Sequence, residues 1–417
     1  MTHDKILPPS IGEGSPTGNC AGARTAVLVG TGMTSVGKLT LRPTILMRRA
    51  LELALAQAGI ALRQVDGLIA IPSLADPHFM EAHYFATQTG LLPRKDVLVR
   101  TIDTGGAGPV TGLIEAARMI EQQVCDVVAV VAGDAVSSLP RDEFLHRADQ
   151  TCRDPEGELP SPVIVHAYDR VARWQMDTYG VTREQLAMCS VLMSRQAARH
   201  PLALTRTPHD LAKVLDSPRI APVTNLLECA RRADGGAALV VASTRFLERN
   251  GISGRGVRVL GGGECSGPLY PPPVIDEDMF SCEEACTTAY QASQLSVKDI
   301  DFFGLYDCYP ICLIRAVEAV GICGKGEGGA WIQAKYEETA GAFEPRAFPV
   351  NTHGGLLAFG APWEVPAMYN VTEAFAQLTG RAEGRQIPNA RRALVYGNGG
   401  IFSASAVAIL ETVAGTP

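Results

Sequence analysis

Residues 97–112 read Val-Leu-Val-Arg-Thr-Ile-Asp-Thr-Gly-Gly-Ala-Gly-Pro-Val-Thr-Gly. The stretch begins as an apolar strand, turns through Gly105 and Gly106, and continues into a helix with apolar residues on one face. The second half of the chain contains a similar turn, Phe348-Pro-Val-Asn-Thr-His-Gly-Gly355. Glycine-rich turns between a strand and a helix in two separate halves predict an α/β protein built from two similar units.

The rest of the chain repeats this alternation of short apolar runs and helical patterns, which predicts βα units and a largely parallel, buried sheet. With 417 residues the chain is long enough for two core-sized units. The expected strands are Ala26–Gly30, Gly67–Ile71, Val97–Ile102, Asp126–Ala132, Ala237–Ala242, Val257–Gly261, Phe302–Leu305, Ala347–Val350, Ala393–Tyr396 and Ala406–Leu410.

Composition excludes several classes of protein. Hydrophobic residues make up 46% of the chain and charged residues 19%, as in a soluble α/β enzyme. A net charge of -7 with scattered Lys and Arg argues against a nucleic-acid partner. No apolar run reaches the roughly 18 residues of a membrane helix. Eleven cysteines, an odd number spread over the chain, favour a reducing cytoplasm over a disulfide framework.

Three further segments carry the features expected of an active site. Gly304-Leu-Tyr-Asp-Cys-Tyr309 follows an expected strand and opens a helix, so its groups point into a crevice at the carboxyl edge of the sheet. Gly360-Ala-Pro-Trp363 and Tyr396-Gly-Asn-Gly-Gly400 lie downstream. Together with the two glycine-rich turns, these segments resemble the thiolases, specifically the branch of sterol-carrier thiolases and lipid-transfer aldolases.

The resemblance covers nearly the whole chain after about residue 25 and implies a duplicated thiolase fold, a five-layer α-β-α-β-α sandwich. It implies a flexible tail at residues 1–24, a first half at 25–250 and a second half at 251–417. Residues 135–225 fit neither half and correspond to the loop domain that thiolases insert over the active site.

The resemblance also shows which family residues this chain lacks. Thiolases carry an acyl-accepting cysteine in the first turn, and that position falls at Gly105 or Gly106 here. The histidine that activates the cysteine is replaced by Ala361. The segment Tyr396-Gly-Asn-Gly-Gly400 replaces the Cys-x-Gly-Gly loop of biosynthetic thiolases, so their second acid/base cysteine is missing as well. The two losses are consistent with each other, because the activating histidine has no role once there is no thiol to deprotonate.

Four residues are candidates for catalysis. Tyr306 stands where sterol-carrier thiolases have a histidine that contacts the thioester oxygen, followed by Asp307 and Cys308. A tyrosine can donate a hydrogen bond to an enolate or, with a lowered pKa, accept a proton; the alternative is a buried aromatic residue. Cys308 fits packing better than a nucleophilic role. His353 is a candidate general acid or base, or else a structural histidine.

Other residues are expected to bind the substrate. Glycines can let the backbone approach a ligand closely, and the polar residues of the family's turns face its pocket; for Tyr396 and Asn398 a purely structural turn is an equal alternative. The expected set is Gly105, Gly106, Asn351, Gly354, Gly355, Tyr396 and Asn398.

Without a cysteine to carry an acyl group, the reaction that fits best is a retro-aldol cleavage. A β-hydroxyacyl-CoA, with a steroid side chain as one candidate, gives a carbonyl compound and a shorter acyl-CoA. The reaction needs a base for the hydroxyl group, donors for the enolate oxygen and an acid for Cα. The alternatives are an acyltransferase that uses another nucleophile, such as Cys308, and a non-catalytic subunit that binds acyl-CoA.

The resemblance implies a homodimer formed through the first half, and a small partner with a zinc ribbon and an OB-fold, of the DUF35 type. The expected ligand is a CoA thioester substrate, with no cofactor bound by the chain. Cysteine pairs spaced i, i+4 have no neighbouring pair of histidines, so no metal site is expected.

Overall fold

The computed structural model describes residues 25–154, 157, 159–252, 256–341 and 343–413. The predicted tail at residues 1–24 lies outside this part of the chain. The strands are β1 (Ala26–Met33), β2 (Gly67–Ala70), β3 (Leu98–Thr101), β4 (Val127–Ala135), β5 (Arg219–Ala221), β6 (Thr224–Asn225), β7 (Asp234–Ser243), β8 (Val257–Ser266), β9 (Phe302–Gly304), β10 (Arg392–Gly399) and β11 (Ala404–Thr412).

Helices alternate with these strands and include one π-helical turn at Gly355–Phe359. The α-helices are α1 (Pro43–Ala58), α2 (Glu81–Thr89), α3 (Gly108–Glu121), α4 (Arg141–Cys152), α5 (Val163–Tyr179), α6 (Arg183–Ala197), α7 (Leu211–Leu215), α8 (Thr244–Arg249), α9 (Cys282–Ser293), α10 (Pro310–Ala319), α11 (Gly328–Glu338) and α12 (Pro366–Leu378).

Nine strands form one sheet in the order β3-β2-β4-β7-β1-β8-β11-β10-β9. Five of them belong to the first half of the chain and four to the second. The halves meet where β1 pairs with β8 over only two residue pairs, Val27 with Arg258 and Leu28 with Val257. Each half therefore contributes its own group of strands to the sheet, and the two groups are joined at this short junction.

The helices complete a layered arrangement. Helix α3 packs against β4 and β7 of the first half and against β10 and β11 of the second, and α12 likewise contacts strands of both halves as well as α3. Helices α1 and α2 cover the outer face of the first half, and α9 covers the outer face of the second. The predicted five-layer α-β-α-β-α sandwich is confirmed, with α3 and α12 as its central layer.

The prediction of a largely parallel sheet is wrong. Only β2–β3, β2–β4 and β9–β10 are parallel, whereas the other five pairings are antiparallel. Strands β10 and β11 are joined by the short turn 400–403, which forces them to run in opposite directions. Burial on both faces gives the same continuous apolar sequence whichever way a strand runs.

The expected strand at 347–350 is reduced to a single bridge between Phe303 and Val350. Pro349 has no N–H to donate, although its carbonyl oxygen accepts from Phe303 N at 2.9 Å. The segment therefore lies beside β9 without extending the sheet.

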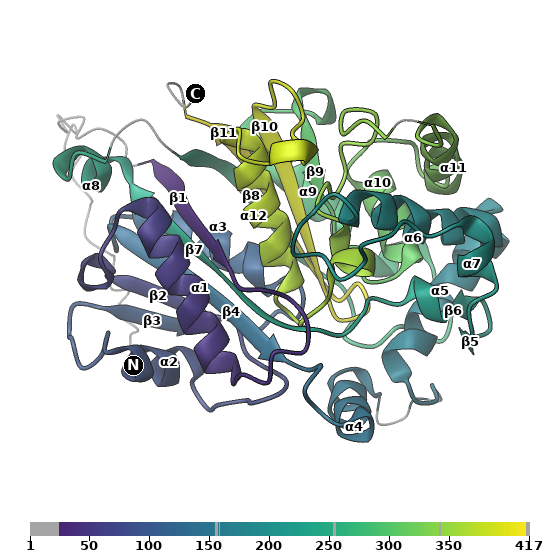
Figure 1. Cartoon of the computed structure of the whole chain (residues 1–417), viewed down its shortest axis with the longest axis horizontal. Helices are drawn as coiled ribbons and strands as arrows, with labels where there is room; N and C mark the ends of the chain where they lie inside the picture. The colour runs from purple at the N-terminus through teal and green to yellow at the C-terminus, as the bar shows by residue number, and fades with distance from the viewer. Residues whose placement is uncertain (1–24, 155–156, 158, 253–255, 342, 414–417) are drawn as a thin grey trace, which may run out of the picture.

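The insert between β4 and β7 contains α4 to α7 and the small hairpin of β5 and β6. Helices α5, α6 and α7 lie on the side of the molecule opposite α1, α2, β2 and β3 (Figure 1). Helices α4 to α7 and the hairpin of β5 and β6 lie within the predicted loop domain, and the domain boundaries at 135, 225 and 250 stay a prediction. None of the described helices is both long and apolar enough to cross a membrane.

We expect Ile114→Ala in α3 to lower the free energy of unfolding by about 2–5 kcal/mol, because it empties space in the central layer. Ile114 is 3% exposed, and a methyl group added at Gly262 of β8 would lie 2.6 Å from its Cγ1. The measurement is urea denaturation. Leu53→Ala on α1, where the side chain is 51% exposed, is the control and should change stability by less than about 0.5 kcal/mol. Equal effects of the two substitutions would contradict the central position of α3.

Candidate functional site

A cavity of about 820 Å³ lies where loops of both halves meet the insert. Its walls come from the loop after β2, the turn after β3, helices α4 and α5, the segment after β9, residues 361–364 and the turn between β10 and β11. Five of the sequence-predicted site residues line it, namely Gly105, Gly106, Tyr306, Cys308 and Asn398. A cavity of this volume can enclose a small-molecule ligand.

Tyr306 lies directly over Gly106. A methyl group built on Gly106 would overlap the Tyr306 hydroxyl and would lie 2.5 Å from the Asn398 carbonyl oxygen. Gly105 has φ 58°, and a methyl group there would lie 3.0 Å from Gly399 Cα. Position 106 therefore cannot carry a cysteine while the Tyr306 ring keeps its place. The missing nucleophile and the tyrosine are two parts of one arrangement.

The Tyr306 side chain is 7% exposed. Burial, more than any neighbouring charge, raises its pKa well above the ordinary value for a tyrosine. The phenol is consequently neutral at physiological pH and can donate a hydrogen bond into the cavity. Of the two roles that the sequence left open for Tyr306, the geometry favours the donor over the proton acceptor.

Asn351 holds the segment that carries Tyr306. Its Nδ2 donates to the Leu305 carbonyl oxygen at 2.7 Å, and Leu305 N donates to Asn351 Oδ1 at 2.7 Å. The side chain thus extends the hydrogen bonding of β9 by one residue. Asn351 is fully buried and is not part of the cavity wall, so its contact with the tyrosine segment is structural.

Asp307, the residue after Tyr306, binds the segment that begins at Gly355. Leu356 N donates to its Oδ1 at 2.7 Å, and burial raises the pKa of this fully buried carboxyl to about 7. Gly355, with φ 58°, packs against the carboxyl, since a methyl group there would lie 2.5 Å from Oδ1. A methyl group on Gly354 would lie 2.5 Å from Ala197 Cβ. These three residues contact protein and do not line the cavity.

His353 also lies outside the cavity wall. It is 2% exposed, its ring packs edge-on against Phe359 at 5.2 Å, and burial lowers its pKa to about 4. The charges nearest to it belong to the buried ion pair of Glu373 and Arg385. The structure therefore gives its predicted acid/base role no contact with the cavity, and favours the structural alternative.

The two predicted residues in the last part of β10, Tyr396 and Asn398, have different surroundings. Asn398 lines the cavity and donates from Nδ2 to Tyr168 Oη at 2.9 Å, and Tyr168 donates to the Gly400 carbonyl oxygen at 2.5 Å. Tyr396 is 1% exposed and faces the protein interior. Tyr168 of the insert, which the sequence did not single out, thereby fixes this turn against α5.

Cys308 is half-buried and lines the cavity. Its Sγ lies 3.6 Å from Cys312 Sγ, one helical turn away. The ten cysteines of the described residues form no disulfide with one another.

Glu364 is the acidic residue of the site that the sequence interpretation missed. It lines the cavity, and its Oε2 is buried with no hydrogen-bond partner in the described part of the chain. Burial, followed by the nearby Asp103 and Asp134, raises its pKa well above the ordinary value. The charge of Glu364 also contributes to the raised pKa of Tyr306, so the two groups are neighbours. In the sequence, Glu364 could have been found as the acidic residue directly after the Gly360–Trp363 segment.

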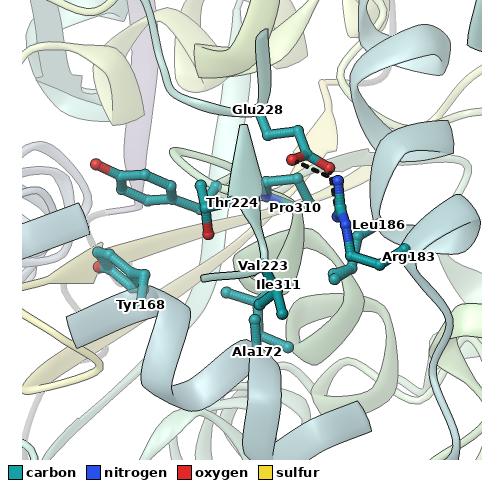
Figure 2. Close-up of a pocket in the computed structure, with 10 residues that line it drawn as sticks. Tyr168, Ala172, Arg183, Leu186, Val223, Thr224, Glu228, Pro310 and Ile311 are labelled. Atoms are coloured by element: carbon teal, nitrogen blue, oxygen red, sulfur yellow. Dashed lines mark hydrogen bonds and ion pairs between the residues drawn. The ribbon is translucent and has the colours of Figure 1, made fainter. Parts of the chain in front are cut away.

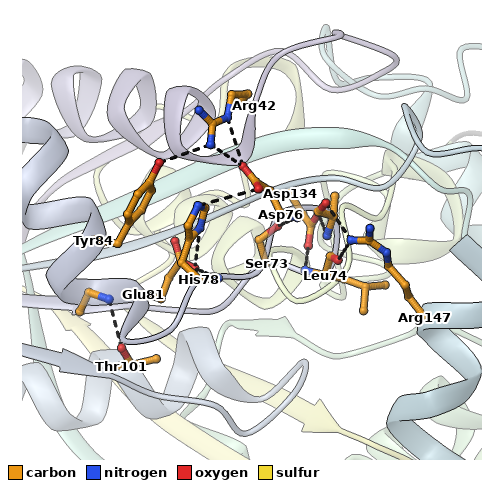
Figure 3. A network of polar contacts seen from close by, with 12 residues as sticks. Arg42, Ser73, Leu74, Asp76, His78, Glu81, Tyr84, Thr101, Asp134 and Arg147 are labelled. Atoms are coloured by element: carbon orange, nitrogen blue, oxygen red, sulfur yellow. Dashed lines mark hydrogen bonds and ion pairs between the residues drawn. The ribbon is translucent and has the colours of Figure 1, made fainter. Parts of the chain in front are cut away.

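The loop after β2 forms one edge of the cavity through Ser73, Leu74 and Pro77. Figure 3 shows the polar groups that hold it. Asp134 accepts from Leu74 N at 2.6 Å, and Arg147 of α4 donates to the Leu74 carbonyl oxygen at 2.9 Å. Burial raises the pKa of Asp134 to about 6. The contacts of Asp134 and Arg147 hold the backbone of this loop in place at the edge of the cavity.

A second, much smaller pocket of about 10 Å³ lies beside the cavity (Figure 2). Arg183 and Glu228 form an ion pair across it at 2.8 Å, and Tyr168 lines both spaces. Such a volume holds about one water molecule, so this pocket belongs to the packing of the insert.

Comparisons with known proteins agree with this geometry. Residues 276–412 match the family described as thiolase C-terminal domain-like. The chain is 28% identical to the acetyl-CoA acetyltransferase of Methanothermobacter thermautotrophicus over 86% of this chain and 91% of that protein. It is 27% identical to sterol carrier protein 2 of Bos taurus over 61% of this chain and 47% of that protein, so the match spans about half of that relative.

Among solved structures, the Ltp2-ChsH2(DUF35) aldolase has a TM-score of 0.77 to this chain at 24% identity, covering 93% of this chain and 98% of that chain. The fold of the two proteins is therefore the same. Taken together, the matches confirm the predicted resemblance to the thiolase superfamily and to its sterol-carrier branch.

We expect Gly106→Ala to destabilise the protein by about 1–3 kcal/mol, because the added methyl group overpacks the space filled by the Tyr306 hydroxyl. The measurement is a double-mutant cycle in urea with Tyr306→Ala, which removes the overlap and should recover part of the loss. Gly384→Ala is the control, since a methyl group there meets no atom within 4 Å. Strictly additive effects at positions 106 and 306 would show that the two residues do not share this space.

Proposed function

We propose that this chain, a member of the thiolase superfamily in its sterol-carrier branch, is an aldolase that cleaves a β-hydroxyacyl-CoA into a carbonyl compound and a shorter acyl-CoA. The main support is the overlap between Tyr306 and the side-chain position of Gly106. Thiolytic cleavage needs a residue that carries the acyl group, whereas retro-aldol cleavage needs none.

Glu364 is the proposed base. Burial raises the pKa of Glu364 well above its ordinary value, which makes its carboxylate a stronger base than that of an exposed glutamate. It takes the proton of the β-hydroxyl group, the Cβ–O bond becomes a carbonyl, and the electron pair of the Cα–Cβ bond passes to Cα. The product of this step is a thioester enolate, which is then protonated at Cα by the acid form of Glu364.

Tyr306 is the proposed donor to the enolate oxygen. A buried, neutral phenol stabilises developing negative charge more strongly than a phenol in bulk water does. The reaction is redox-neutral overall, so the proposed chemistry needs no redox cofactor. A bulky acyl group, such as a steroid side chain, is compatible with the cavity volume of about 820 Å³.

An acyltransferase is the second candidate, supported by the 28% identity to an acetyl-CoA acetyltransferase and by the position of Cys308 on the cavity wall. It would proceed through an acylated Cys308. The two functions differ in whether acyl mass is found on the protein during turnover. A subunit that binds acyl-CoA without reacting is the third alternative, and it would give no product at all.

We propose a DUF35-type partner with a zinc ribbon and an OB-fold, because the similar aldolase structure carries DUF35 in its name. A homodimer through the first half is proposed as well. Strand β3 lies at the edge of the sheet, and its Leu98 is 43% exposed. An unpaired edge with an exposed apolar residue is suited to pairing with a second copy.

We expect Tyr306→Phe to lower kcat for carbonyl formation from a β-hydroxyacyl-CoA by about 10²–10³-fold, and Glu364→Gln to lower it by about 10²–10⁴-fold. Product is measured by carbonyl trapping, with and without a co-expressed DUF35 protein. Tyr396→Phe, which alters a buried tyrosine outside the cavity wall, is the matched control and should retain activity. Full activity of both site variants, or an acyl group on the intact protein in a mass spectrum, would refute the aldolase.

We expect Leu98→Glu to convert a dimer into monomers, because it places a charge where two β3 edges would pair. Light scattering after size exclusion gives the mass. Leu53→Glu, on a leucine of similar exposure in α1 (51%), should leave the mass of the dimer unchanged. A dimer that survives Leu98→Glu, or a wild-type monomer, would show that β3 is not the interface.

A further inference from the structure

Two arginines line the cavity and have no ionic partner. Arg141 is the first residue of α4, and Arg232 lies two residues before β7. Neither forms an ion pair or donates a hydrogen bond from its side chain within the described chain. Most other cavity-lining polar groups of the insert are engaged; Asp149, for example, accepts from Val163 N at 2.8 Å.

Arg232 is the more enclosed of the two. It is half-buried, its Nη1 is fully buried without a hydrogen-bond partner, and its guanidinium lies 4.5 Å from the centre of the Phe144 ring. Burial lowers its pKa, and the charge of Arg141 lowers it further, which shows that the two cations are near each other. A desolvated cation without a partner costs free energy, and a bound anion would offset that cost.

The nearest carboxylate is already in use. Asp234 accepts from Leu39 N at 2.8 Å and from Ser138 Oγ at 2.5 Å. It therefore fixes the backbone around the start of β7. Its charge still acts on Arg232 and opposes the lowering of the pKa of Arg232, but the two side chains form no ion pair. At the other acidic position, Glu364 is influenced by Asp103 and Asp134 and not by the arginines.

The backbone places Arg232 beside the reacting end of the cavity. Arg232 forms a β-bridge with Ala361. Ala361 N donates to the Arg231 carbonyl oxygen at 2.8 Å, and Ala233 N donates to the Ala361 carbonyl oxygen at 3.3 Å. Ala361 lies three residues before Glu364, and Trp363 between them packs edge-on against Phe144 at 6.0 Å. Ala361 and Arg232 both line the cavity at this point.

We propose that Arg232, assisted by Arg141, binds a carboxylate on the acyl group, so that the substrate is a β-hydroxyacyl thioester with a second acidic group. The proposal rests on the aldolase function proposed above and names its substrate class. A guanidinium recognises a carboxylate through paired, charge-assisted hydrogen bonds. The phosphates of CoA are also anions that a guanidinium can bind. Because Arg232 lies beside Ala361, three residues before Glu364, we expect it to meet the acyl end of the thioester.

Binding of unreactive thioesters by calorimetry tests this on the intact chain. The probes are glutaryl-pantetheine, which has the carboxylate and no phosphate, pentanoyl-pantetheine, which has neither, and pentanoyl-CoA, which has only phosphates. We expect glutaryl-pantetheine to bind about 10- to 100-fold more tightly than pentanoyl-pantetheine. Equal affinity of the two pantetheine thioesters would overturn the proposal, and this comparison needs no variant.

The variant Arg232→Gln should remove most of the advantage of glutaryl-pantetheine and leave the affinity for pentanoyl-CoA within about twofold. Arg231→Gln is the matched control, because it removes the same charge from an exposed neighbour that does not line the cavity. A loss of affinity for pentanoyl-CoA instead would assign Arg232 to the phosphates and overturn the proposal. These experiments measure binding and no turnover. The proposal on carboxylate binding can therefore fail or succeed independently of the aldolase assay.

Discussion

The site depends on one steric constraint, which is that Gly106 has no side chain where the Tyr306 hydroxyl lies. The constraint acts in both directions. A nucleophile at position 106 would displace the ring, and with the ring in place the turn can present only backbone groups. At this turn the cavity is therefore met by backbone groups and by the Tyr306 hydroxyl, whose hydrogen bonding is strengthened by burial and orientation.

The orientation is set by residues that do not reach the cavity. Asn351 continues the hydrogen bonding of β9 and fixes the backbone just before Tyr306. Asp307 holds the π-helical turn through Leu356. Because α3 and α12 pack against strands of both halves, the turns at 105–106 and 306 keep a fixed separation although they come from different halves.

Much of the fold could be predicted because the signals are local. The apolar runs and the glycine-rich turn before α3 correctly indicated strands, helices and duplication. The direction of the strands could not be predicted, since β7 and β11 are buried on both faces and read as continuous apolar runs in either orientation. Val350 was expected in a strand, but Pro349 beside it cannot donate to a ladder.

Within the site, the sequence predicted five residues that line the cavity, whereas the position of the others depends on long-range packing. His353 follows an active-site-like asparagine, yet the turn buries it against Phe359. Glu364 and Arg232 are unremarkable in sequence and become neighbours of the cavity only because residue 361 bridges residue 232. Pairing between segments more than a hundred residues apart has no periodicity that a single sequence reveals.

The sheet and the insert contribute different parts of the cavity, and this has a consequence for how the ligand preference of the protein can change. The sheet and its central helices supply Gly106 and Tyr306, whereas side chains such as Phe144 and Leu145 of α4 and Ile164 of α5 form walls that face the cavity from the insert. Exchanging those wall residues would reshape the space for a new acyl chain with little change in the layers that hold the reacting groups. A scaffold of this kind can change the ligand that it accepts while its central layers stay the same.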